Sequence, residues 1–176
     1  MEASTTPTIC RLPDLPRHQL STIAPRVAIR FVDHNGKPTD DYIDGIPVVA
    51  VNIYVGLTYQ STPGQVAEAT KLTKRFDALV DTGANTTMIT KGVAGNLTPL
   101  RAVPTQNQAE PGVGSVYGAV VQIDGLDRPY PIEVGLANLI PGLAMLLGRD
   151  MISKYRLVFD TPNKEFYLEN TDQIGF

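Results

Sequence analysis

The sequence predicts an all-β domain. Short apolar runs rich in Val, Ile, Tyr and Phe recur along the chain, a pattern typical of strands. The 15 glycines and 14 prolines fall between these runs and favour turns. At 176 residues, the chain is long enough for one domain with a real core and short for two.

The beginning of the chain is expected to be less regular than the rest. Residues 1–24 carry Thr, Ser and Pro without apolar periodicity, which indicates a flexible or surface-strapped tail. Residues 25–45 are expected to form an N-terminal hairpin extension, with a strand at 27–32. The Asn35-Gly36 pair favours a tight turn in which both residues have positive φ.

The main domain is predicted over residues 46–170, followed by a C-terminal tail at 171–176. Its first strand spans 46–57 and is apolar enough to be buried on much of both faces. Residues 58–74 interrupt the pattern, as a short helix or as an extended excursion. The next strand, 75–80, runs directly into Asp81.

The remaining elements follow from the same alternation of apolar runs and turn residues. They are a strand at 86–90, a hairpin with a long glycine-containing tip built from 100–103 and 116–123, strands at 132–134 and 144–147, a short helix at 149–155, and closing strands at 157–160 and 165–169 around the turn 161–164.

Composition excludes several classes of function. The net charge is −3, without a basic run, so nucleic acid is not an expected partner. Cys10 is the only cysteine, and the two histidines, His18 and His34, precede the dense part of the sequence. We therefore expect no disulfide, metal or cofactor. The chain lacks a long apolar run and a signal peptide, so a cytoplasmic protein without membrane contact is expected.

Asp81-Thr82-Gly83 stands where an apolar strand meets a turn. A carboxylate at the end of a buried strand is costly unless it is paired or hydrogen-bonded. Gly83 permits a backbone shape or a close approach that a side chain would block. Taken alone, however, the tripeptide favours a surface turn in which Asp81 caps backbone N–H groups.

Two further segments change this interpretation. Ala84 extends the first motif, and residues 145–150 read Met-Leu-Leu-Gly-Arg-Asp. Together they resemble the retropepsin family of single-domain aspartic proteases. That family has an apolar strand, Asp-Thr/Ser-Gly-Ala, a glycine-bearing flap, and an apolar pair followed by Gly-Arg-Asn/Asp and a short helix, in this order. The resemblance spans about 46–169 and implies a small closed barrel with one short C-terminal helix.

The resemblance assigns roles to the loop residues. Asp81 would be catalytic, and Thr82 would form a hydrogen bond across a dimer axis. Gly83 and Ala84 would complete the loop, and Thr87 would brace it from the following strand.

The resemblance also identifies residues near the site. Gly148, Arg149 and Asp150 would be structural, although Asp150 also fits an N-terminal helper of its own helix. The flap would be the hairpin around 106–114, and Gly83 would contact substrate with Gly112, Val113 and Gly114.

Asn85, also expected to contact substrate, departs from the family pattern. Retroviral members usually have a carboxylate there, which can pair with the helix arginine. Arg149 is therefore expected to find another partner.

Peptide hydrolysis by this route needs two carboxyl groups close together. The chain has one Asp-Thr-Gly, because Asp44-Gly45 and Asp124-Gly125 lack the hydroxyl residue and indicate turns, as does Asp160. A two-fold axis beside Asp81 would supply the second carboxylate. The leading hypothesis is a homodimeric aspartic endopeptidase acting on peptide or protein substrates.

Two alternatives remain open. One is a dimer of the same fold that binds peptides or partners and cleaves little, since an intact loop is necessary but insufficient for turnover. The other is a purely structural β domain, which requires both motif matches to be accidental.

Overall fold

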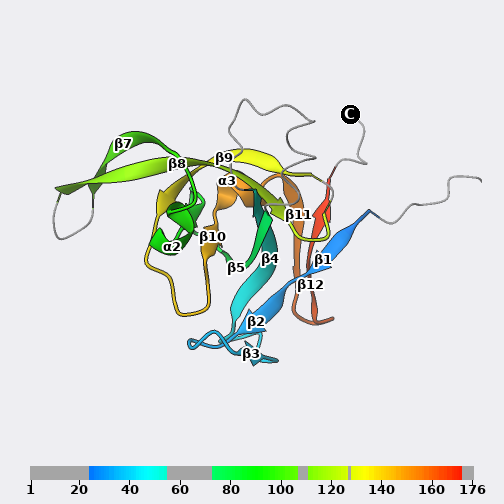
Figure 1. Ribbon diagram of the computed structural model, residues 1–176. Coiled ribbons are helices and arrows are strands. Elements are labelled where there is room, and N and C mark those ends of the chain that lie inside the picture. Colours follow the sequence, from blue (N-terminus) through cyan, green and yellow to red (C-terminus); the bar gives the residue numbers. More distant parts are fainter. Residues whose placement is uncertain (1–23, 55–72, 107–110, 127, 172–176) are drawn as a thin grey trace, which may run out of the picture.

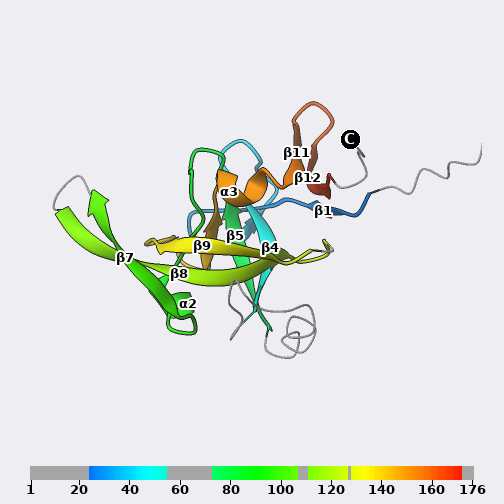
Figure 2. The ribbon, with the colours of Figure 1, turned by 90° about the horizontal axis from the view of Figure 1, so that it is seen from above.

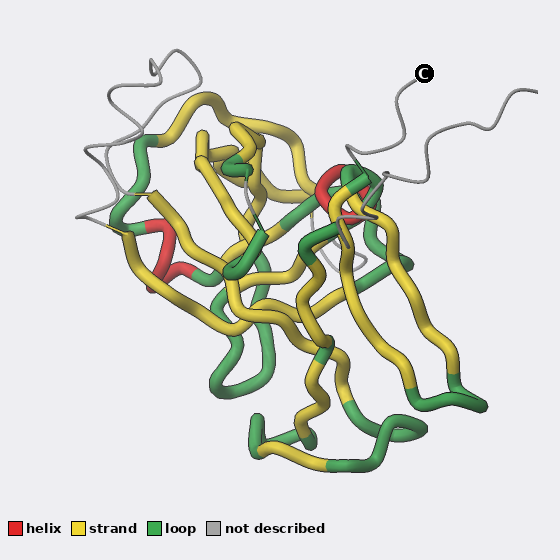
Figure 3. The backbone as a smooth tube through the Cα atoms, turned by 90° about the vertical axis from the view of Figure 1, so that its right-hand side faces the viewer, coloured by secondary structure: helices red, strands yellow, loops and turns green. Residues whose placement is uncertain are grey.

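The computed structural model describes residues 24–54, 73–106, 111–126 and 128–171. Strands dominate this part of the chain (Figure 3). They are β1 (Arg26–Ala28), β2 (Arg30–Val32), β3 (Pro38–Thr39), β4 (Ile46–Tyr54), β5 (Thr73–Val80), β6 (Met88–Ile89), β7 (Pro99–Gln106), β8 (Pro111–Ile123), β9 (Tyr130–Leu136), β10 (Met145–Leu147), β11 (Tyr155–Asp160) and β12 (Glu165–Asn170). The described helices are α2 (Lys91–Ala94) and α3 (Arg149–Ile152).

The larger sheet closes on itself. Its strand order is β3-β2-β4-β5-β10-β6-β9-β8-β7, and β8 also pairs with β4. The strands from β4 to β8 in this order therefore form a closed barrel, with Val51 of β4 opposite Ile123 of β8 at the closing seam. Because the sheet is closed, each of these strands pairs with a neighbouring strand on both sides. The predicted all-β class and closed barrel are confirmed.

Two parts of the chain extend from this barrel on opposite sides (Figures 1 and 2). The β7–β8 hairpin projects on one side, where it pairs with the barrel through β8 and β9. A separate sheet of order β1-β12-β11 lies on the other side. The chain thus has a protruding hairpin and a small second sheet flanking one barrel.

β4 shows why the barrel strands are so apolar. Val49, Val51 and Ile53 are buried in the main core. Val48 points into a second cluster with Val32 and Leu143. Both faces of β4 are therefore covered, as expected for a continuous apolar run. Burial of this many aliphatic side chains is the main force that holds the barrel together.

The N-terminal segment differs from the expected single strand followed by an Asn-Gly turn. Strand character breaks at Ile29, whose N–H bonds to the Phe166 carbonyl at 2.8 Å, so β1 pairs with β12 and β2 with β3 and β4. In the turn, Gly36 has φ of 77°, whereas Asn35 keeps negative φ. A positive φ at both turn positions was therefore the wrong expectation.

Asp33 explains the observed turn. One of its carboxylate oxygens accepts the backbone N–H groups of Lys37 and Asn35, each at 2.8 Å. These hydrogen bonds, with that from Lys37 the strongest influence, lower the pKa of Asp33. The turn is thus held by an Asp side chain rather than by two left-handed residues.

The predicted elements around the second half of the barrel are largely confirmed. The closing strands are β11 and β12, and the turn between them places Lys164 at φ of 54°. The predicted helix at 149–155 is too long, because α3 ends at Ile152 and Tyr155 already begins β11. The strand expected at 86–90 shortens to β6, and α2 follows it as a second short helix that the sequence analysis did not predict.

The segment 55–72, which contains most of the excursion between β4 and β5, lies outside the described residues. So do the predicted N-terminal tail up to residue 23 and the tip of the hairpin at 107–110. None of the described helices has the length and apolar character that crossing a membrane requires.

Candidate active site

β5 delivers Asp81 to the end of the barrel. Its last residues pair in parallel with β10, with Val80 opposite Leu147, and Ala78 and Val80 are buried. The Asp81 N–H continues this ladder by donating to the Leu147 carbonyl at 3.1 Å. The position of Asp81 is therefore fixed by a buried strand pair rather than by a free loop.

The Asp81 side chain is tied to its own turn. Its Oδ1 accepts the backbone N–H groups of Gly83 at 2.8 Å and Ala84 at 3.3 Å. A Cβ at Gly83 would lie 3.1 Å from this oxygen, so glycine allows the close approach. Among the described residues, no hydrogen bond reaches Oδ2. The carboxylate is oriented through one oxygen and keeps the other available.

The loop is exposed beyond this carboxylate. Asp81 is partly buried, while Thr82 and Gly83 face solvent. Exposed Thr82 and Gly83, after a strand whose last residue Val80 is buried, leave the carboxylate accessible from outside the barrel.

A buried hydrogen-bond network braces the loop from below. Thr87 is fully buried, and its hydroxyl donates to Asp150 Oδ1 at 2.7 Å while accepting the Gly148 N–H at 3.1 Å. The Thr87 N–H donates to Asp150 Oδ2 at 3.0 Å. Asp150 lies in the first turn of α3, as expected, but its carboxylate binds Thr87 and does not cap the free N–H groups of its own helix.

Gly148 lets the two motifs touch. A Cβ at this position would lie 2.5 Å from the carbonyl carbon of Thr86, a contact that no side chain tolerates. The close approach allows the Arg149 N–H to donate to the Ala84 carbonyl at 2.9 Å and the Asp150 N–H to the Asn85 carbonyl at 3.3 Å. The start of α3 is thus bonded to the Asp81 loop.

Arg149 contacts Asn85 and not the other partner that was expected for it. Its guanidinium donates to the Asn85 side-chain carbonyl, so the expectation of a different partner was wrong. An amide oxygen accepts from a guanidinium as a carboxylate does, although without the opposite charge. Asn85 therefore serves as the acceptor for Arg149 without contributing a negative charge.

A cavity of about 350 Å³ lies between the end of the loop and the β7–β8 hairpin. Its walls come from the residues after the loop, from both hairpin strands and from β9. They are Thr86, Met88, Arg101, Val103, Gly114, Ser115, Val116, Glu133, Val134, Gly135 and Leu136.

This cavity contains one of the predicted flap residues. Gly114 lines it, whereas Gly112 and Val113 belong to β8 closer to the tip of the hairpin. Met88, Arg101 and Glu133 were not identified from the sequence. In the sequence, Glu133 stands between the apolar residues Ile132 and Val134, an alternation that indicates an exposed side chain on a strand. No motif connects this position with Arg101.

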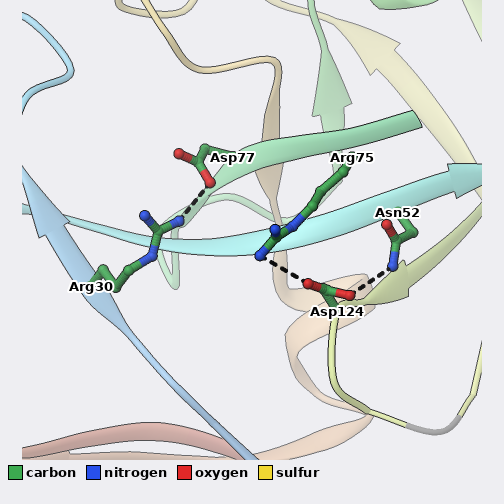
Figure 4. Close-up of polar contacts among 5 residues, drawn as sticks. All are labelled: Arg30, Asn52, Arg75, Asp77 and Asp124. Carbon is green, nitrogen blue, oxygen red and sulfur yellow. Dashed lines mark hydrogen bonds and ion pairs between the residues drawn. The ribbon is translucent and has the colours of Figure 1, made fainter. Parts of the chain in front are cut away.

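The other carboxylates considered from the sequence lie elsewhere. Asp124 pairs with Arg75 at 2.9 Å and accepts the side-chain N–H of Asn52 at 3.1 Å (Figure 4). Asp160 accepts the Asn163 N–H at 3.3 Å within the β11–β12 turn. The contact of Asp160 lies within its own turn, in agreement with the turn interpretation. Asp124 also stands in a turn, where Gly125 has φ of 90°, but its side chain contacts residues of β4 and β5.

Comparisons with known proteins find likeness in structure only. No family model matches the chain, and no curated protein matches it either. Among solved structures, it is similar to a retropepsin-like aspartic protease from Rickettsia conorii, at 16% identity and a TM-score of 0.48, covering 84% of this chain and 92% of that one.

Two other solved structures are similar at lower scores. One is the protease of simian foamy virus (mac), with 16% identity, a TM-score of 0.41, and 60% and 91% of the two chains covered. The other is the retroviral protease-like domain of Ddi1 from Leishmania major, with 12% identity, a TM-score of 0.41, and 74% and 98% covered. At these identities the likeness concerns the fold alone.

The chain's own elements follow the order that the sequence resemblance implied. β5, the Asp81 loop, the β7–β8 hairpin, β10 and α3 occur in this sequence, and hydrogen bonds join the loop to the start of α3. The retropepsin-like fold expected from the two motifs is therefore confirmed.

Proposed function

We propose that this chain is an aspartic endopeptidase that acts as a homodimer, with Asp81 of each copy supplying one of two catalytic carboxylates. The observation that carries the proposal is the state of the Asp81 side chain. Backbone N–H groups orient one oxygen, and the exposed tip of the loop leaves the carboxylate open to a partner and to water.

The chemistry requires two such groups. One carboxylate takes a proton from water, while the other, protonated, donates a hydrogen bond to the substrate carbonyl and later assists the leaving amine. Two carboxyl groups about 3 Å apart cannot both ionise, so the pair shares a proton and titrates as a unit. Neither a metal nor a cofactor enters this mechanism.

A second copy of the chain is the simplest source of the second group. The sequence contains one Asp-Thr-Gly, and a two-fold axis beside Asp81 would bring two identical loops together. Thr82, exposed at the tip of the loop, would then form the hydrogen bond across the axis.

The substrate would bind as an extended peptide between the loop and the β7–β8 hairpin. Extended peptides are recognised through backbone hydrogen bonds and pockets for side chains. The cavity behind Thr86 and Met88 offers such a pocket, with apolar walls from Val103, Val116 and Leu136.

The test is cleavage of a diverse peptide library between acidic and neutral pH, with sedimentation velocity measured on the same samples. We expect a cleaving dimer and a rate reduced about a thousandfold or more in Asp81→Asn, since an amide cannot accept the proton from water. Asp77→Asn, on the same strand, is the matched control and should cleave like the wild type.

Two results would contradict the proposal in different ways. If the wild type cleaves nothing and binds no pepstatin-type inhibitor, the chain is a peptide-binding dimer or a structural domain. If it cleaves as a strict monomer, the two-copy arrangement of the carboxylates is wrong.

A further inference from the structure

An ion pair stands in the wall of the cavity beside the loop. Arg101 Nη2 lies 2.5 Å from Glu133 Oε2, and both residues line the cavity. Arg101 belongs to β7 and Glu133 to β9, with β8 between them. In the strand register, Arg101 is opposite Val116 and Glu133 is opposite Gly118. The pair therefore spans β8 diagonally on one face.

The rest of the described lining carries no charge. It consists of apolar side chains, glycines and the hydroxyl residues Thr86 and Ser115. The two charged side chains stay partly in water, with 55% of Arg101 and 44% of Glu133 exposed. Each charge is thus neutralised by the other at the solvent side of a mainly apolar space.

The ion pair affects which side chains can enter the cavity. A charged side chain entering it would lose part of its hydration and meet one like and one opposite charge from a neutral pair. An uncharged apolar side chain loses no hydration of this kind and gains burial. The pairing therefore disfavours both acidic and basic side chains.

We propose that Arg101 and Glu133 are the charge-selectivity residues of this cavity, and that their pairing makes it select an uncharged apolar side chain of the substrate. The inference rests on the proposed peptidase function. Neither residue touches the Asp81 loop in any described hydrogen bond, so their role is selection of substrate and not catalysis.

Removing either charge should change the preference in a predictable direction. In Glu133→Gln, the unpaired guanidinium of Arg101 would attract an acidic side chain. In Arg101→Gln, the unpaired carboxylate of Glu133 would attract a basic one. Because the pair is half exposed, we expect each preference to change about two- to fivefold relative to Leu. The exchanged variant Arg101→Glu with Glu133→Arg should restore the apolar preference.

The experiment profiles cleavage of a randomised peptide library by mass spectrometry for the full-length wild type, the two single variants and the exchanged variant. We expect opposite shifts at the same peptide position, toward Asp and Glu for Glu133→Gln and toward Lys and Arg for Arg101→Gln. Asp77→Asn is the matched control, because it also breaks an exposed ion pair of similar length, 2.6 Å to Arg30, away from the cavity.

Thermal melts of all variants distinguish a change of selectivity from a loss of folding. In addition, the ratio of the cleavage rates of two peptides within one sample does not depend on the amount of folded enzyme. Identical preferences at every position in all variants would overturn the inference and leave the peptidase proposal intact. Absence of cleavage by the wild type would instead overturn the peptidase proposal.

Discussion

β5 and the turn directly after it carry aspartates in opposite situations. Asp77, within the strand, forms an ion pair with Arg30 at 2.6 Å (Figure 4). Asp81, directly after the strand, has no cationic partner among the described residues, and its contacts are backbone N–H groups. The same strand thus presents one carboxylate neutralised by a guanidinium and one oriented by the main chain.

The difference indicates that the Asp77 carboxylate has a structural role, whereas the Asp81 carboxylate is available for chemistry. A guanidinium occupies the acceptor positions of a carboxylate and holds its charge in place. Main-chain N–H groups orient the Asp81 carboxylate through one oxygen, and no hydrogen bond from the described part of the chain reaches the other. The support for this open group comes from a second layer, in which Thr87, Gly148 and Asp150 hold the loop without touching the Asp81 side chain.

Exchanging each aspartate for asparagine gives the largest contrast. We expect Asp81→Asn to lower kcat/KM about a thousandfold or more. Asp77→Asn should leave kcat/KM within about twofold of the wild type. It should cost less than about 1 kcal/mol of stability, because its ion pair with Arg30 is exposed. Peptide-cleavage kinetics and urea unfolding measure the two effects. Equal losses of activity would show that Asp81 has no special role.

Gly148→Ala tests the close contact beneath the loop. The added methyl would meet the Thr86 backbone at 2.5 Å, and we expect a loss of about 3 kcal/mol in the free energy of unfolding. Gly148 has φ of −85°, so alanine is not excluded by backbone conformation. Gly95→Ala is the control, because its Cβ would meet no atom closer than 3.9 Å. A neutral Gly148→Ala would contradict the observed packing.

Thr87→Val removes the buried hydroxyl at nearly constant volume. The Gly148 N–H and one oxygen of Asp150 would lose their partner, and we expect a cost of about 2–3 kcal/mol in denaturant unfolding. Activity should fall as well, since the loop loses its brace. Thr87→Ser keeps the hydroxyl and should retain most of the stability that valine loses. If serine and valine are equally destabilising, packing of the methyl matters more than the hydrogen bonds.

The smallest effect concerns Asp33, whose pKa is lowered chiefly by the Lys37 N–H. A lowered pKa in the folded state stabilises the protein above the ordinary value of 3.8, and this contribution is lost as the pH falls below it. The stability difference between wild type and Asp33→Asn should therefore shrink between pH 5 and pH 3 in urea titrations. A difference independent of pH would show that the charge of Asp33 does not support the turn.

Several features of the molecule were predictable from local sequence. The apolar run in β4, the turn before β12 and the strand leading to Asp81 depend on burial patterns and turn residues close together in the chain. The two motifs also indicated the identity of the loop and of the segment that supports it. Local chemistry was sufficient because each of these elements is specified by its own residues.

Tertiary structure decided which of these residues meet. Asp150 bonds Thr87, Arg149 keeps Asn85 as its partner, and Arg101 reaches Glu133 across β8, although each pair is distant in sequence. No local pattern encodes such contacts, because they depend on how strands are ordered and aligned in the closed barrel. The sequence by itself therefore determined the fold class and the candidate carboxylate. The closure of the sheet decided what braces that carboxylate and which charges line the adjoining cavity.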